Sequence, residues 1–159
     1  MPLSKLRQFL DSQHIKYLVI SHSLAYTAQG VAALAHVSGK KLAKTVILKV
    51  DGVLAMVVVP ASSHVDLDRV RALTGGRAVE IATEREFQNA FPDCELGAMP
   101  PFGNLYDMPV YADETLAGNE EITFSAGTHR ELVRMSWEDM LRLVNPTVAE
   151  LTYHRLAAA

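Results

Sequence analysis

Two apolar runs separated by a single Asp-Gly pair constrain the fold of this chain more than any other feature. The first run spans residues 44–50 and the second residues 53–59, with Asp51 and Gly52 between them. Asp-Gly favours the two-residue turn of a β-hairpin, because both turn positions need a positive φ. The sequence therefore predicts an antiparallel hairpin in which Val50 pairs with Val53.

Lys44 is the only charged residue on one face of this predicted hairpin. Strand side chains alternate between two faces, so Lys44 shares its face with seven apolar residues: Val46, Leu48, Val50, Val53, Ala55, Val57 and Val59. An ammonium group at the rim of an apolar surface must reach water, find a counter-charge or meet an anionic ligand. The third alternative would make Lys44 a site residue.

The composition fits one soluble domain. The chain has 159 residues, of which 49% are hydrophobic, enough to bury a core without metal or disulfide support. The single cysteine, Cys94, excludes an intramolecular disulfide. The sequence lacks the pattern of a signal peptide and any apolar run long enough to span a membrane, so we expect a cytoplasmic protein.

The net charge of −3 and the pI near 6.0 argue against a broad nucleic-acid-binding surface. A generic DNA-binding protein is disfavoured for the same reason, and no recognition-helix motif is present. A small basic patch is not excluded, although solvated surface charge explains most of its candidates more simply: Lys40, Lys41, Lys44, Arg69, Arg71, Arg77, Arg130 and Arg134.

Helices and strands alternate irregularly along the chain. Capping residues and apolar spacing predict helices that begin near Ser4, Thr27, Asp66, Thr83 and Ser136. Short β-prone runs predict strands over residues 17–20, 77–82, 109–112, 121–124 and 131–135. A last amphipathic turn is expected around Val148, Leu151 and Leu156. This mixture indicates an α+β fold, with an irregular Gly- and Pro-rich loop over residues 91–103.

The usual catalytic signatures are absent. The chain has no Gly-x-Ser-x-Gly elbow, P-loop, Gly-x-Gly-x-x-Gly or His-Glu-x-x-His sequence. Its six histidines lie far apart, so we expect no metal site. Cys94 has no neighbouring base in the sequence, and an unreactive thiol is the simpler interpretation.

Three features remain as candidates: Lys44, the loop Gly97–Pro101 and His129. Gly97 permits close backbone approach and the prolines stiffen the loop, which would let its amides face a ligand oxygen. Composition alone favours a plain surface crossover for this loop. His129 fits an exposed turn histidine as well as a hydrogen-bonding site residue.

Together these motifs resemble the YbaK-like editing domain family associated with prolyl-tRNA synthetase. The resemblance runs from about Ser21 to Val144 and rests on four motifs in order: Lys44-Thr45, Gly97-x-x-x-Pro101 continued by Phe102-Gly103, Asp113-Glu114 and Gly127-x-His129. It implies one editing domain over residues 1–159, with a mixed, largely antiparallel, barrel-like sheet flanked by helices. It also implies hydrolysis, in trans, of mischarged aminoacyl-tRNA without metal or cofactor.

The resemblance implies three catalytic residues, Lys44, Gly97 and His129. Lys44 would engage the 3′-terminal nucleotide, the backbone of Gly97 would meet the ester, and the ribose hydroxyl beside the ester would place or activate the water. The residues beside these three are expected to bind substrate: Thr45, Val46, Ala98, Met99, Pro100, Pro101, Phe102, Gly103, Gly127 and Thr128. Met99, Phe102 and Val46 are equally compatible with core positions, and for Val46 the core is favoured.

The substrate stays open within the small amino acids alanine, serine, threonine and cysteine. Alanine-clearing members of the family tend to carry asparagine where this chain has Thr45, and one methylene changes discrimination by only about 1 to 3 kcal/mol. The expected partner is the tRNA acceptor end, with a synthetase as a further candidate. The alternative hypothesis is a non-catalytic module that binds a nucleotide or the acceptor end as an accessory to a synthetase.

Overall fold

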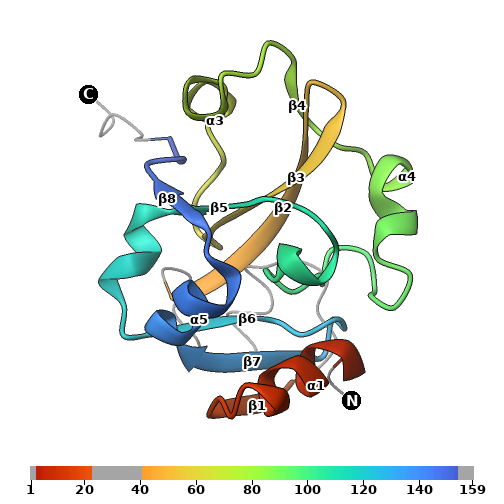
Figure 1. Ribbon diagram of the computed structural model, residues 1–159, viewed down its shortest axis with the longest axis vertical. Helices are drawn as coiled ribbons and strands as arrows, with labels where there is room; N and C mark the ends of the chain where they lie inside the picture. Colours follow the sequence, from red (N-terminus) through yellow and green to blue (C-terminus); the bar gives the residue numbers. More distant parts are fainter. Residues whose placement is uncertain (1–2, 23–40, 154–159) are drawn as a thin grey trace.

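The computed structural model of the protein describes residues 3–22 and 41–153. Within these ranges the chain forms an eight-stranded mixed sheet in the order β1-β7-β6-β2-β3-β5-β8, with β4 paired to β2 (Figure 1). The strands are β1 (Tyr17–Ser21), β2 (Leu42–Val50), β3 (Val53–Pro60), β4 (Val79–Ile81), β5 (Val110–Asp113), β6 (Glu121–Ser125), β7 (Glu131–Ser136) and β8 (Thr147–Ala149). The predicted α+β fold is confirmed.

Four of the seven strand pairings among the described residues are antiparallel, whereas β2–β6, β3–β5 and β5–β8 are parallel. The sheet is open and does not close into a barrel, because β1 and β8 stand at the two ends of the strand order. The expected mixed, largely antiparallel pairing is therefore confirmed, but the sheet is open rather than barrel-like.

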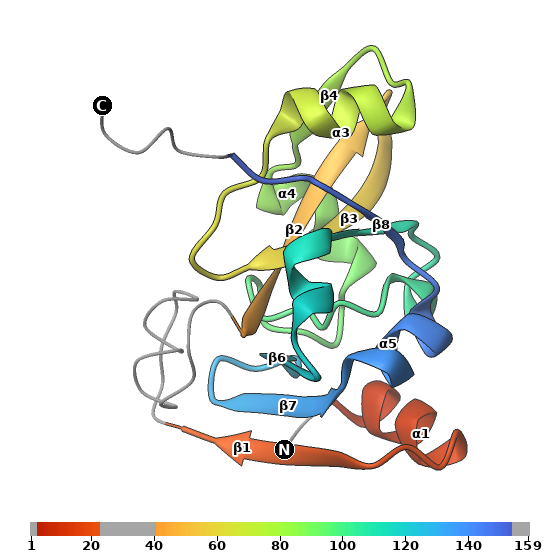
Figure 2. The same cartoon turned by 90° about the vertical axis from the view of Figure 1, so that its left-hand side faces the viewer.

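Helices lie at both ends of the molecule and between them (Figure 2). They are α1 (Ser4–Ser12), α3 (Leu67–Thr74), α4 (Glu84–Phe87) and α5 (Trp137–Val144), with 3-10 turns η1 (Gln88–Ala90), η2 (Gly103–Leu105) and η3 (Glu114–Gly118). In both views α1 lies near β1 and β7, and α3 lies at the opposite end beside β4. The predicted helix near Thr27 lies outside the described residues. No helix in the described ranges is long and apolar enough to cross a membrane.

The hairpin predicted from Asp51-Gly52 is confirmed in its register. Val50 pairs with Val53, and Lys44 pairs with Val59. One face of the hairpin packs into the main core through residues such as Ile47 and Met56. This core also contains residues of α1, β6, β7 and α5. The other face, which carries Lys44, contributes Leu48, Val57 and Val59 to a smaller apolar cluster completed by α3. The two faces thus belong to different parts of the core.

Three of the predicted caps are confirmed and one is wrong. Asp66, Thr83 and Ser136 each accept a main-chain N–H at the start of α3, α4 and α5, respectively. Ser4 is not a cap but the first residue of α1. The preceding residue, Leu3, is held by its N–H to the carbonyl of Ala126 at 3.0 Å, so a long-range bond fixes where this helix begins.

Two predictions near strand ends need correction. The predicted strand over 77–82 is shortened to β4, because the main-chain N–H groups of Arg77 and Ala78 donate to the Asp51 carboxylate. The expected helical turn around Val148 is wrong: this segment is β8, paired in parallel with β5. Leu156 lies outside the described residues. The Gly- and Pro-rich loop is confirmed, since no helix or strand lies between Phe91 and Phe102.

Candidate active site

The loop that contains Gly97 is hydrogen-bonded to the turn that follows β6. The N–H of Glu95 donates to the carbonyl of Gly127 at 2.8 Å, and the N–H of Gly127 donates to the carbonyl of Ala98 at 2.9 Å. The His129 ring lies 2.7 Å, through Nε2, from the carbonyl oxygen of Leu96. These three contacts join segments that are more than 25 residues apart in the sequence, and they place Gly97 beside His129.

Both loops need glycine where they have it. Gly97 has a φ of +88° and Gly127 a φ of +95°, in the region that L-residues with a side chain rarely adopt. A Cβ at Gly97 would lie 3.3 Å from Cε1 of His129, and one at Gly127 would lie 2.9 Å from Cβ of Leu3. The absence of a side chain therefore permits the close approach of His129 at Gly97 and of Leu3 at Gly127.

His129 holds the Gly97 loop in place. A carbonyl oxygen only accepts hydrogen bonds, so Nε2 must carry the hydrogen that the carbonyl of Leu96 receives. The residue is only 7% exposed, which rules out the exposed turn histidine considered from the sequence. Its main-chain N–H donates to Oε2 of Glu95 at 3.3 Å. His129 is thus bound to the loop through both its ring and its backbone.

The N–H of Gly97 is bound only by a weak acceptor. Gly97 is exposed, and the acceptor of its N–H is the thioether sulfur of Met99 at 3.2 Å. A thioether is a weak acceptor, so a carbonyl or ester oxygen entering this position would form a stronger bond. Gly97 thus carries a weakly bonded backbone donor on an exposed loop residue.

Lys44 lies on the strand that adjoins the same turn. Ala43 on β2 pairs with Phe124 on β6, and β6 leads through Ser125 and Ala126 into Gly127. Burial lowers the pKa of Lys44 below its usual 10.5, because the charged form loses hydration. The side chain of Lys44 makes no ion pair or hydrogen bond with any residue in the ranges 3–22 and 41–153, although its backbone belongs to the β2–β3 ladder. A half-buried ammonium group without a counter-charge in this part of the chain is suited to an anionic or oxygen-rich ligand.

The predicted substrate-binding residues lie in three segments. Thr128 and Gly127 lie in the turn itself, and the Thr128 hydroxyl donates to Glu131 at 3.4 Å. The residues of the loop after Gly97 are buried: Ala98, Met99, Pro100, Pro101, Phe102 and Gly103. Thr45 and Val46 follow Lys44 along β2 and are half-buried.

Phe102 and Val46 have core surroundings. The Phe102 ring is fully buried, with ring centroids 6.1 Å from Phe9 and 5.5 Å from Phe124. Val46 packs against the smaller apolar cluster beneath α3. Met99 belongs to the main core and also bonds Gly97, so it connects the core to the loop. Between the two interpretations weighed for these residues, their packing favours the core for Phe102 and Val46.

A family profile for the aminoacyl-tRNA editing domain matches residues 22–143 of this sequence. The chain belongs to the aminoacyl-tRNA editing domain family. The matched range contains β2, the Gly97 loop and the turn at Gly127, and the resemblance inferred from the four motifs is confirmed at this level.

Relatives connect this editing domain with proline-specific synthetases. It is 30% identical over 87 residues to the proline–tRNA ligase of Bacillus mycoides (strain KBAB4), which covers 55% of this chain and 15% of the ligase. A crystal structure provisionally described as a trans-editing enzyme for prolyl tRNA synthetase matches with a TM-score of 0.80 and 25% identity, covering 94% of this chain and 96% of that one.

The hypothetical protein APE2540 shares the fold, with a TM-score of 0.85 and 19% identity over 94% of this chain and the whole of that one. The fold of this editing domain is therefore that of its solved neighbours. The matched part is only 15% of the length of the synthetase relatives.

The Asp113-Glu114 motif of the editing domain has a structural role on its Asp113 side. The Asp113 carboxylate is fully buried, and its Oδ1 accepts the N–H of Leu151 at 2.8 Å. Its Oδ2 accepts the main-chain N–H and the hydroxyl of Thr115. Asp113 thus caps η3 and connects the segment after β8 to β5. These donors also compensate the cost of burying its carboxylate.

Cys94 is unsuited to nucleophilic catalysis. Burial raises the pKa of its thiol to about 11, and the Tyr106 hydroxyl lies 3.3 Å from the sulfur. Because the thiolate is the reactive form, Cys94 is almost wholly unreactive at neutral pH. This agrees with the unreactive thiol inferred from the sequence.

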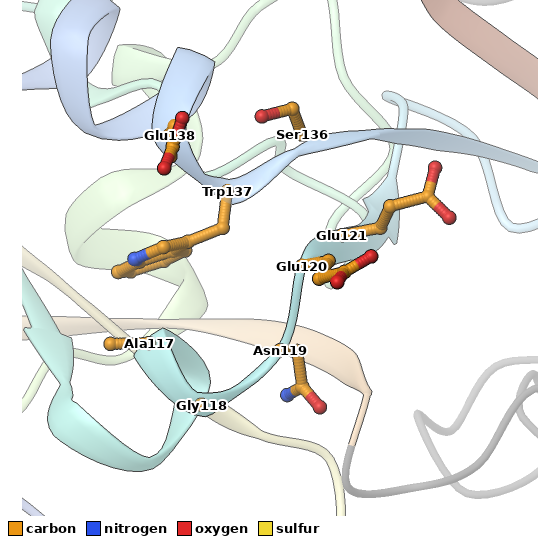
Figure 3. A pocket seen from close by; sticks show the side chains of 8 residues that line it. All are labelled: Ala117, Gly118, Asn119, Glu120, Glu121, Ser136, Trp137 and Glu138. Atoms are coloured by element: carbon orange, nitrogen blue, oxygen red, sulfur yellow. The ribbon is translucent and has the colours of Figure 1, made fainter.

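Sequence reasoning missed Glu95, which precedes Gly97 by two residues and binds the His129 backbone. The available signal was a carboxylate two residues before Gly97 in a breaker-rich loop. A pocket of about 570 Å³ lies between η3 and the start of α5, bordered by Trp137 and Glu138 (Figure 3). It was not predicted from the sequence. That pocket contains none of Lys44, Gly97 and His129.

Proposed function

We propose that the protein hydrolyses the ester bond of mischarged aminoacyl-tRNA that carries a small amino acid, of the alanine, serine, threonine or cysteine class. It would act in trans as one editing domain over residues 1–159, in the cytoplasm, and would contact the acceptor end of the tRNA. The contact between the Gly97 loop and His129 supports this proposal most directly, because it holds in place an exposed loop whose Gly97 N–H has only a weak acceptor. The second support is that the chain belongs to a family of editing domains.

The reaction needs little from the protein because an aminoacyl ester is already activated. Water adds to the ester carbonyl carbon, and the bond from that carbon to the ribose oxygen breaks. The ribose oxygen takes a proton, and the products are the free amino acid and tRNA with a free terminal hydroxyl. In this proposal the N–H of Gly97 binds the carbonyl oxygen as negative charge develops on it.

Lys44 is proposed to bind the terminal nucleotide and His129 to position the Gly97 loop. Lys44 would bind the phosphate or ribose oxygens of the terminal nucleotide through its ammonium group. The Nε2–H of His129 is donated to the carbonyl of Leu96, so His129 is proposed to hold the loop rather than to remove a proton from water. The ribose hydroxyl beside the ester would place the water, and no cofactor or metal is proposed.

The test uses a panel of tRNAs charged with alanine, serine, threonine or cysteine. Loss of the ester from each is measured with wild type and with Lys44→Ala. We expect rapid loss with at least one substrate and a strong reduction in the variant. Unchanged turnover in Lys44→Ala would remove Lys44 from the mechanism. No turnover on any substrate, combined with binding of aminoacyl-tRNA analogues, would favour a non-catalytic module that is an accessory to a synthetase. The bond from His129 Nε2 to the carbonyl of Leu96 is the observation on its side, because this nitrogen is then not a base.

A further inference from the structure

Glu95 is held against the candidate site by its backbone and by its side chain. Its N–H donates to the carbonyl of Gly127 at 2.8 Å, and its carbonyl accepts the N–H of Ala98 at 3.0 Å. Its carboxylate oxygen Oε2 accepts the main-chain N–H of His129 at 3.3 Å. Three bonds therefore fix the position of an anionic side chain next to Gly97.

The second carboxylate oxygen of Glu95 is unoccupied within the described part of the chain. The residue is exposed, and no ion pair or further side-chain bond of Glu95 occurs among residues 3–22 and 41–153. Several other acidic side chains have partners. Glu86, for example, pairs with Lys49, and Asp93 lies within hydrogen-bond distance of the Tyr106 hydroxyl. Glu95 thus combines a fixed position with a free acceptor.

Glu95 and Gly97 lie in the same turn of the loop, which the bond from the N–H of Ala98 to the carbonyl of Glu95 closes, and both residues contact His129. A Cβ at Gly97 would lie 3.3 Å from the His129 ring, and Oε2 of Glu95 lies 3.3 Å from the His129 main-chain nitrogen. In an aminoacyl ester the α-amino group and the carbonyl group are on adjacent carbons. An ester whose carbonyl oxygen is bound by the N–H of Gly97 would therefore carry its amino group close to this carboxylate.

The charges of Glu95 and Lys44 are opposite to those at the two ends of the proposed substrate. The substrate class of the proposed function has a positive α-ammonium group at one end and phosphates at the other. The site offers Glu95 on the loop and Lys44 on β2, two opposite charges without a counter-ion in the described residues. Opposite charges placed in this way favour one orientation of a ligand.

We propose that Glu95 binds the α-ammonium group of the aminoacyl ester, so that the enzyme accepts aminoacyl-tRNA with a free amino group and discriminates against N-acylated aminoacyl-tRNA. This inference rests on the proposed function. It assigns to the site a second specificity, for the amino group, which is independent of the size of the amino-acid side chain.

The experiment compares alanyl-tRNA, or the best substrate of the panel, with its N-acetylated form. The variants are Glu95→Gln, which keeps an oxygen acceptor for the His129 N–H but loses the charge, and Glu84→Gln. Glu84 is an exposed carboxylate on α4 without a side-chain bond among the described residues, so this control makes the same change in net charge. Thermal unfolding checks that both variants are folded.

We expect wild type to prefer the free amine by about tenfold or more, which corresponds to about 1.4 kcal/mol. Glu95→Gln should lose about this factor on the free amine and keep its rate on the N-acetylated ester, whereas Glu84→Gln should change neither rate. An equal loss on both substrates would overturn the inference and leave Glu95 as a positioning residue. Unchanged rates on both would also overturn it. Absence of turnover in wild type would instead overturn the proposed function.

Discussion

Strand β2 carries two lysines whose surroundings are opposite in kind. Lys49, at the hairpin end, contacts Glu80 at 3.2 Å and also pairs with Glu86. Lys44, near the turn after β6, has no such partner in the ranges 3–22 and 41–153 and is partly buried. Hydrogen bonds to Glu86 and then Glu80 raise the pKa of Lys49, whereas burial lowers the pKa of Lys44. The same residue type thus stabilises one end of the strand and is available to a ligand at the other.

The difference shows how to separate structural from functional charges in this domain. A charge that the fold uses is satisfied by the fold, as in the Lys49 pairs and in the buried Asp113 carboxylate. A charge kept for a ligand is left without a partner at some cost in stability. Lys44 and Glu95 lack an ion-pair partner within the described residues, as the proposed function requires.

Exchange of each lysine for methionine gives the largest expected difference. Lys44→Met should reduce deacylation by about 100-fold, because a preorganised positive charge is lost from the site. Lys49→Met should retain activity within about twofold, because its ion pairs lie at the hairpin end, on the opposite face of the strand. Single-turnover ester loss on the best substrate of the panel measures both.

Chemical denaturation of the same pair provides the control. Lys44→Met should unfold at the same or a higher denaturant concentration than wild type, since an unpaired, partly buried charge is removed. Lys49→Met should unfold at a lower one. A large loss of stability in Lys44→Met, or equal activities of the two variants, would contradict the contrast between the two lysines.

Gly97→Ala should have the next largest effect. The added Cβ would lie 3.3 Å from Cε1 of His129 and require a positive φ, so we expect about a tenfold loss of activity and about 1 kcal/mol of stability. Gly75→Ala is the matched control: its φ is +73°, but nothing lies within 4 Å of the added atom. It should lose similar stability and no activity. Full activity of Gly97→Ala would show that the loop does not contact substrate.

The two lysines should give opposite stability slopes at alkaline pH. Between the lowered pKa of Lys44 and 10.5, the unfolded chain binds more protons than the folded one, so its contribution to the free energy of unfolding rises with pH. The pKa of Lys49 is raised above 10.5, so its stabilisation is complete below 10.5 and is lost as pH rises through the folded value. Urea unfolding across this range should show the rising part vanish in Lys44→Met and the falling part vanish in Lys49→Met.

The smallest expected effect is at acid pH. The ion pair with Lys49 and the Thr83 N–H lower the pKa of Glu86 to about 2, from 4.5. Its stabilisation is therefore present above pH 4.5 and is lost as pH falls toward 2. Glu86→Gln should flatten the decline of stability in this window, as followed by circular dichroism. An unchanged acid transition would mean that solvent screens this surface pair completely.

The candidate site was only partly predictable. Lys44, Gly97 and His129 were named through the resemblance to editing domains, and the structure brings Gly97 and His129 into contact. Glu95 was missed because its role depends on a bond to the His129 backbone, 34 residues away. The strand β8 was missed for a similar reason: its pairing with β5 overrode an amphipathic pattern.

Local sequence by itself determined the β2–β3 hairpin and three helix starts. Asp51-Gly52 and the caps at Asp66, Thr83 and Ser136 act on backbone angles within a few residues, so their effect is present before the chain folds. Only the tertiary structure decided that Leu3 is the N-cap of α1, that the Lys44 side chain lacks a partner among the described residues while Lys49 has two, and that His129 binds Leu96. These outcomes depend on burial and on contacts between distant segments, which form only when the sheet assembles.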